Sequence, residues 1–146
     1  MPITYRIDHE RRLVDTTVVG VLTSPEIFAY QREVWSRPEV AGYDELVDMG
    51  DATLDEFVSH ELVSWLAELS ASMDTPSPSR FAIVASEDLH FGLGRMYERM
   101  REMKPGSTKA VGVFRTRPEA LEWLGLANAA VNDNGGAAAA ERDAAS

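Results

Sequence analysis

The apolar segment at residues 81–85 constrains the fold more than any other part of the sequence. Phe-Ala-Ile-Val-Ala is an unbroken hydrophobic run, which is typical of a central strand covered on both faces. Segments with a helical spacing of apolar residues lie before and after it, and strands separated by helices favour a parallel sheet with right-handed crossovers. We therefore expect an α/β domain.

The other strands and helices have local signals of their own. Alternating or β-branched segments predict strands at 3–8, 13–21, 45–49 and 110–114. Amphipathic segments predict helices that begin near residues 24, 53, 87 and 117. The predicted fold is a mixed five-stranded sheet with about four helices, in which an N-terminal antiparallel hairpin is followed by parallel βαβ units.

Residues that can cap helices set the predicted helix starts. Ser24 precedes Pro25, and Ser86 precedes the third predicted helix. Thr53 and Thr116 each stand three residues before a glutamate, which is the spacing of a capping box. We therefore expect the four helices to begin directly after these serines and threonines.

The predicted helix at 87–103 is rich in methionine. Its expected apolar face consists of Leu89, Leu93, Met96, Tyr97, Met100 and Met103. Gly92 and Gly94 lie inside the helix and lack the spacing of a nucleotide-binding loop. We interpret them as a place where this helix approaches a neighbour closely, at a cost in helix propensity.

The composition excludes several classes of function. The chain has no cysteine, which excludes disulfides, thiolate metal sites and thiol catalysis. Its formal net charge of −10 works against binding to nucleic acid or to anionic membranes. We find no signal segment and no apolar run long enough to span a membrane. We expect a soluble cytoplasmic protein with one domain at 1–131 and a disordered alanine- and glycine-rich tail at 132–146.

The order of several short motifs resembles a bacterial family. Ala29-Tyr30-Gln31 lies in the first predicted helix, Leu46-Val47-Asp48 ends a strand, and residues 91–97 read Phe-Gly-Leu-Gly-Arg-Met-Tyr. Residues 113–124 close the pattern with Val-Phe-Arg-Thr-Arg-Pro-Glu-Ala-Leu-Glu-Trp-Leu. Over about residues 3–126 the chain resembles the SpoIIAA-like proteins, small bacterial STAS-type domains related in fold to anti-sigma-factor antagonists and CRAL-TRIO lipid carriers.

This resemblance implies a non-enzymatic module that binds a protein partner or itself. The alternative is a carrier of a small hydrophobic or amphipathic ligand, held in a pocket between helices and sheet. Some STAS domains are switched by phosphorylation at the start of the helix after the third strand. Thr53 is the hydroxyl residue at that place, within Asp51-Ala52-Thr53-Leu54, where the paired serines and the glycine of the family motif are missing. Thr53 is thus the candidate phosphoacceptor, and a helix cap is the other interpretation.

The residues form no recognisable catalytic centre, so we expect no enzymatic activity. The three histidines are scattered, and no serine has an evident base. Asp48, Asp51 and Asp55 could offer oxygen ligands to Mg²⁺, but aspartate is equally common in turns. We assign no metal and no cofactor.

The 87–103 helix also carries the candidate surface for a ligand or partner. Arg95 and Arg99 lie one turn apart and could hold an acidic group, while Phe91 lies off the expected core face. Met96 and Met100 add adaptable apolar surface, although packing in the core is the other interpretation. An interaction module predicts a filled interior, whereas a carrier predicts an apolar cavity with one or two polar anchors.

Overall fold

The computed structural model describes residues 2–55 and 58–126. The strands are β1 (Ile3–Asp8), β2 (Leu13–Leu22), β3 (Asp44–Leu54), β4 (Ser79–Val84) and β5 (Lys109–Phe114). The helices are α1 (Ser24–Trp35), the short 3-10 helix η1 (Pro38–Val40), α2 (His60–Ser72), α3 (Asp88–Glu102) and α4 (Arg117–Trp123). No described helix has the length and apolar character needed to cross a bilayer. The predicted boundary at residue 131 and the tail at 132–146 lie outside the described residues.

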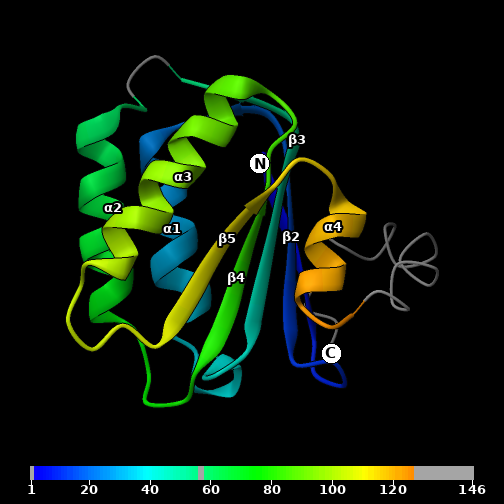
Figure 1. Cartoon of the computed structure of the whole chain (residues 1–146), viewed down its shortest axis with the longest axis vertical. Coiled ribbons are helices and arrows are strands. Elements are labelled where there is room, and N and C mark those ends of the chain that lie inside the picture. Colours follow the sequence, from blue (N-terminus) through cyan, green and yellow to red (C-terminus); the bar gives the residue numbers. More distant parts are fainter. Residues whose placement is uncertain (1, 56–57, 127–146) are drawn as a thin grey trace.

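The sheet has the strand order β1-β2-β3-β4-β5. β1 pairs with β2 in the antiparallel sense, and all later pairs are parallel, which confirms the predicted mixed sheet. Each parallel crossover moves one strand further in the same direction, so right-handed connections place α1, α2 and α3 on one face. The last helix, α4, folds back onto the other face (Figure 1).

The face covered by α4 packs residues of β3, β4 and β5 against that helix. Leu46 of β3 and Ala82 of β4 are fully buried in one cluster with Leu121 of α4. At Gly112 of β5, an added Cβ would stand 3.2 Å from the indole of Trp123. The missing side chain of this glycine therefore lets α4 pack directly on the sheet.

The opposite face is covered by α1, α2 and α3 and holds three apolar clusters. One surrounds Ile7 and Val34, near the end of α1. Another joins Ala67 of α2 to Ile83 of β4, and the third surrounds Val18 of β2. The candidate site lies between the second and third clusters.

The structure confirms one predicted helix cap and shifts two by a single residue. Thr116 precedes α4, and its hydroxyl accepts a backbone hydrogen bond from the first turn, as predicted. The cap of α1 is Thr23 rather than Ser24, and the cap of α3 is Glu87 rather than Ser86. Thr23 and Glu87 are the residues with the extended backbone that a cap requires.

The prediction that Thr53 begins a helix is wrong. β3 continues to Leu54, and within it Thr53 pairs with Val21 of β2. The cap of α2 is Ser59, whose hydroxyl accepts a hydrogen bond from the backbone of the first turn. Pairing with β2 extends the strand through a segment whose local pattern favours a helix, because strand formation depends on neighbours that are distant in sequence.

The predicted inward face of α3 is also wrong in part. Leu89 and Met103 are 66% and 77% exposed, although both were expected to face the core. The buried residues of the helix are His90, Gly94, Tyr97 and Arg101. Apolar periodicity misses this face because two of its members, His90 and Arg101, are polar.

Gly94 confirms the predicted close approach of α3 to a neighbour. An added Cβ would stand 3.1 Å from Val113 Cγ1 on β5, which is tighter than an ordinary van der Waals contact. Gly92 has no atom within 4 Å of the corresponding position, so the prediction holds for one of the two glycines.

Candidate functional site

A cavity of about 140 Å³ lies between the sheet and the three helices α1, α2 and α3. Val18, Val47 and Met49 line it from β2 and β3, and Leu66 and Leu93 line it from α2 and α3. Side chains alternate between the two faces of a strand, so Val47 points toward the cavity while its neighbour Leu46 packs against α4. Most of the lining is apolar, and only a few polar side chains contribute to the wall.

Tyr30 forms the centre of one polar group on the cavity wall. Its hydroxyl donates to Glu45 Oε2 at 2.7 Å and lies 2.8 Å from Thr16 Oγ1. Trp35 Nε1 donates to the same hydroxyl at 3.4 Å. Burial, with the charge of Glu45, raises the pKa of Tyr30 well above its ordinary value of 10.0. The phenol therefore keeps its proton and uses it in the hydrogen bond to Glu45. In this arrangement Thr16 is the donor to the hydroxyl of Tyr30.

Lys109 completes this group from the first residue of β5. Its Nζ lies 3.8 Å from Glu45 Oε1 and 3.5 Å from the centroid of the Trp35 ring. Burial raises the pKa of Glu45, although the positive charge of Lys109 acts in the opposite direction. Burial also lowers the pKa of Lys109. The resulting contacts connect the end of α1 to the amino ends of β3 and β5.

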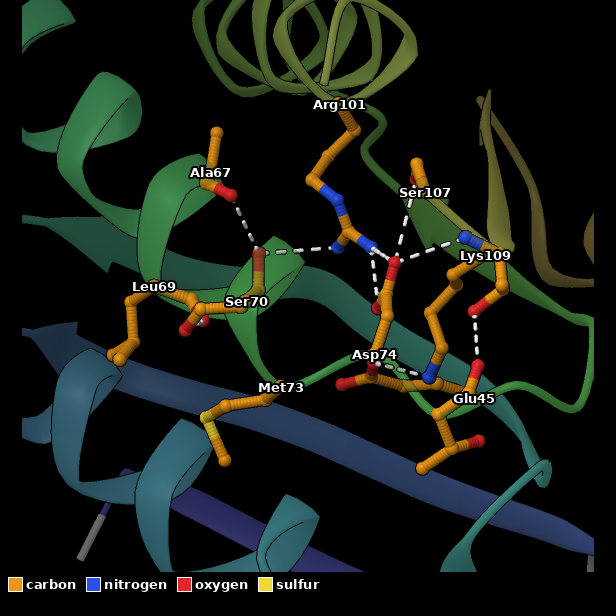
Figure 2. A network of polar contacts seen from close by, with 12 residues as sticks. Glu45, Ala67, Leu69, Ser70, Met73, Asp74, Arg101, Ser107 and Lys109 are labelled. Atoms are coloured by element: carbon orange, nitrogen blue, oxygen red, sulfur yellow. Dashed lines mark hydrogen bonds and ion pairs between the residues drawn. The ribbon is translucent and has the colours of Figure 1, made fainter. Parts of the chain in front are cut away.

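A second buried polar group, the Arg101 cluster, consists of Ser70, Asp74, Tyr97 and Arg101. Figure 2 shows Ser70, Asp74 and Arg101 of this cluster. Arg101 Nη2 donates to both carboxylate oxygens of Asp74 at 2.7 Å, and Nη1 donates to Tyr97 and Ser70 at 2.9 and 3.1 Å. Burial opposes the charge on Arg101, but Tyr97 and Asp74 outweigh it and raise its pKa. This cluster fastens the ends of α2 and α3 together beside the cavity.

His90 contributes a further polar side chain to the wall, from the first turn of α3. Its side chain is only 5% exposed, and its buried Nδ1 makes no hydrogen bond within the described part of the chain. Glu87 Oε2 lies 3.7 Å from Nδ1. This separation exceeds hydrogen-bonding distance.

A separate open groove runs between α1 and α2 on the outside of the helices. Trp65 lies in it with 57% of its surface exposed, next to Phe28 and Leu69. Arg32 and Glu61 line the same groove and carry opposite charges. It is the most apolar exposed feature that we find on the described surface of these two helices.

The predicted surface on α3 does not coincide with the cavity. Its members are Phe91, Arg95, Met96, Arg99 and Met100, and none of them lines the cavity. The Phe91 ring lies 4.0 Å from the guanidinium of Arg115, and Arg95 pairs with Glu98 at 2.9 Å. Both methionines pack in the cluster between α2, α3 and the sheet, while Arg99 is exposed. A binding role for this surface stays a prediction.

The other sequence candidates also lie away from the cavity. Thr53 is exposed on β3, and its role as a phosphoacceptor stays a prediction without the helix N-terminus that motivated it. Asp48 Oδ1 accepts a hydrogen bond from the backbone of Gly50 at 2.9 Å, within β3 and beside the irregularity in its pairing with β2. Within residues 2–55 and 58–126, no three histidine, aspartate or glutamate side chains gather as metal ligands.

Sequence reasoning missed the polar side chains of the cavity wall. Thr16, Glu45 and His90 each interrupt or border an apolar face, which is the signal that could have identified them. Tyr30 and Gln31 belong to a motif quoted for the family resemblance, and both line the cavity.

Known structures match this chain in fold. No family model and no curated protein sequence matches it. Among solved structures, the chain aligns with that of an uncharacterized protein from the DUF3478 family, from Shewanella loihica PV-4, which is described as having a SpoIIAA-like fold. The alignment covers 84% of this chain and 93% of that one, with 18% identity and a TM-score of 0.54. This protein is therefore an α/β domain with a SpoIIAA-like fold.

Proposed function

We propose that this domain binds and holds a small, largely apolar molecule in the cavity between the sheet and α1, α2 and α3. The observation that carries the proposal is the cavity itself, with about 140 Å³ of space and a mainly apolar wall. Well-packed interiors contain few voids larger than a water molecule. A space of this size, inside a domain whose other face packs closely, favours the carrier interpretation over an interaction module with a filled interior.

The volume of the cavity limits the size of the ligand. An engineered cavity of about 150 Å³, lined by aliphatic and aromatic side chains, binds benzene. The present cavity is of similar size, so it suits a single ring or a short carbon chain rather than a long-chain lipid. Burial of such a molecule supports a Kd in the micromolar to millimolar range, which corresponds to about −4 to −8 kcal/mol.

Toluene is the simplest probe of this proposal, because it has the required size and no polar group. An NMR titration of the full chain should shift backbone amide signals of residues around the cavity in a saturable manner. Toluene at ten times its Kd should also raise the free energy of unfolding by about 1.4 kcal/mol.

Two cavity-filling variants provide the test of location. Val47→Phe fills the space from β3 and Leu66→Phe fills it from α2, so both should abolish toluene binding. The far-ultraviolet circular dichroism spectrum of each variant should remain that of the folded protein. Trp65→Ser, in the outer groove, is the matched control and should bind toluene like the wild type. Absence of saturable binding to the wild type, or equal binding by both filled variants, would contradict the proposal.

Self-association through the groove between α1 and α2 is the second candidate function, and the exposed Trp65 is the observation that favours it. A two-fold axis across this groove would place Arg32 of one copy opposite Glu61 of the other. Light scattering over a wide range of protein concentrations should then detect a dimer that Trp65→Ser and Arg32→Glu weaken. A wild-type monomer at every concentration would exclude this candidate.

A further inference from the structure

His90 is the feature of the cavity that the proposed function leaves unexplained. Its imidazole lines the wall, its side chain is 5% exposed, and its Nδ1 is buried without a hydrogen bond to any described residue. Burying a polar nitrogen without a partner costs folding free energy. An apolar side chain at this position would avoid that cost, so packing alone does not explain the presence of a histidine.

The other polar side chains of the wall already have partners. The hydroxyl of Tyr30 contacts Glu45 and Thr16, and the hydroxyl of Tyr97 contacts Ser70 and Arg101. Gln31 Nε2 donates to the sulfur of Met73 at 3.7 Å. An incoming hydrogen-bonding group would compete with these contacts, whereas at His90 it competes with none of the hydrogen bonds described here.

The position of Glu87 indicates which chemistry His90 offers to a ligand. Glu87 Oε2 lies 3.7 Å from Nδ1, so of the two neutral tautomers its negative charge favours the one that carries the proton on Nδ1. In that tautomer Nε2 is a hydrogen-bond acceptor. Nδ1 is fully buried beside Glu87, so we take Nε2 as the ring nitrogen that a ligand in the cavity reaches.

We propose that the ligand is a single-ring or similarly small apolar molecule with one hydrogen-bond donor, such as a phenol, and that Nε2 of His90 accepts that donor. This inference rests on the proposed function and deepens it by naming the ligand class and the anchoring residue. The cavity volume sets the size of the apolar part, and the imidazole of His90 in the cavity wall sets the polar part. One donor suffices, because the rest of the wall is apolar or already hydrogen-bonded.

The test compares 4-methylphenol with toluene, which has the same shape without the hydroxyl group. Both are titrated by NMR into the full-length wild type, His90→Leu and His90→Gln. In the wild type, 4-methylphenol should bind about 10-fold more tightly than toluene, the effect of one satisfied hydrogen bond. His90→Leu should reduce this ratio to about 1-fold by weakening 4-methylphenol alone, while His90→Gln, which keeps an acceptor, should restore part of the ratio.

The possible outcomes separate this inference from the proposed function. If neither compound binds the wild type, both proposals fail. If both bind with equal affinity, the cavity is a ligand site but the donor requirement is wrong. If the preference for 4-methylphenol survives in both His90 variants, another wall residue is the anchor and the role of His90 is wrong.

A spectroscopic measurement on the wild type covers the case in which the His90 variants unfold. The Nε2 resonance of His90, followed in protein with ¹⁵N-labelled imidazole rings, should move on addition of 4-methylphenol and stay in place on addition of toluene. Equal changes with the two compounds would overturn the anchoring role, because a merely structural histidine responds to occupancy of the cavity and not to the hydroxyl group.

Discussion

The two faces of the sheet use the same strands but are covered in different ways. On one face, the single helix α4 packs directly on small residues such as Ala82 and Gly112. On the other, α1, α2 and α3 together cover the sheet (Figure 1) and leave a cavity of about 140 Å³, with buried polar side chains in its wall. The closely packed face and the face with the cavity therefore differ in the free space that they enclose.

The largest expected effect comes from breaking the Arg101 cluster. Arg101→Met leaves Asp74 buried without its cationic partner, so we expect a loss of about 3–5 kcal/mol in the free energy of unfolding. Arg117→Met is the matched control on the α4 face, because it breaks a more exposed ion pair with Asp15 and should cost about 0–1 kcal/mol. Urea denaturation of both variants measures the difference. Equal losses would mean that the two faces do not differ in how they hold charged groups.

Enlarging a side chain on each face sharpens the comparison of their packing. Ala82→Leu forces extra volume into the closely packed face and should destabilise the domain by about 1–3 kcal/mol. Val47→Leu adds volume toward the cavity and should change the free energy of unfolding by less than about 0.5 kcal/mol. The same denaturation measurement applies, and a loss for Val47→Leu as large as that for Ala82→Leu would contradict the presence of usable space.

The start of α2, which helps cover the cavity face, provides a smaller effect. Ser59→Ala removes the hydroxyl that accepts a backbone hydrogen bond at this helix terminus and should cost about 1 kcal/mol. Thr53→Val is the control, since Thr53 is exposed on β3, and it should lie within about 0.5 kcal/mol of the wild type. A larger loss of stability for Thr53→Val than for Ser59→Ala would indicate that Thr53, and not Ser59, caps the helix.

The smallest expected effect is the pH dependence of the buried Glu45–Lys109 pair. Burial raises the pKa of Glu45 from 4.5, so the stability linked to Glu45 is highest below pH 4.5 and falls as pH rises through the raised value. Burial lowers the pKa of Lys109 from 10.5, so the stability linked to Lys109 grows as pH rises from the lowered value toward 10.5. The wild-type curve should show both slopes relative to the double variant Glu45→Gln/Lys109→Gln. Parallel curves for the two proteins would show that the pKa values of Glu45 and Lys109 are not shifted in these directions.

Strong local patterns were sufficient to predict the architecture. The run at 81–85 and the alternation of strands and helices gave the sheet, and the capping box at Thr116 gave the start of α4. The capping pattern at Thr53 misled, because the ladder between β2 and β3 extends the strand through it. A pattern within a few residues cannot report a partner strand that lies some thirty residues away, as Val21 lies from Thr53.

The candidate site was much harder to predict than the fold. The sequence pointed to the exposed charges and methionines of α3, whereas the cavity wall uses His90, Gly94 and Tyr97 from another face of the same helix. Polar residues such as His90 and Arg101 read as surface residues in a hydrophobicity pattern. Their burial depends on partners from other elements, such as Asp74 beyond the end of α2.

The class of the domain, the mixed sheet and the order of its elements follow from hydrophobic periods of two and 3.6 residues within each segment. The cavity between the three helices and the sheet, and the place of His90 in its wall, follow instead from tertiary packing. Volume between elements and the pairing of buried polar atoms depend on how distant segments meet, and no local pattern of residues contains that information.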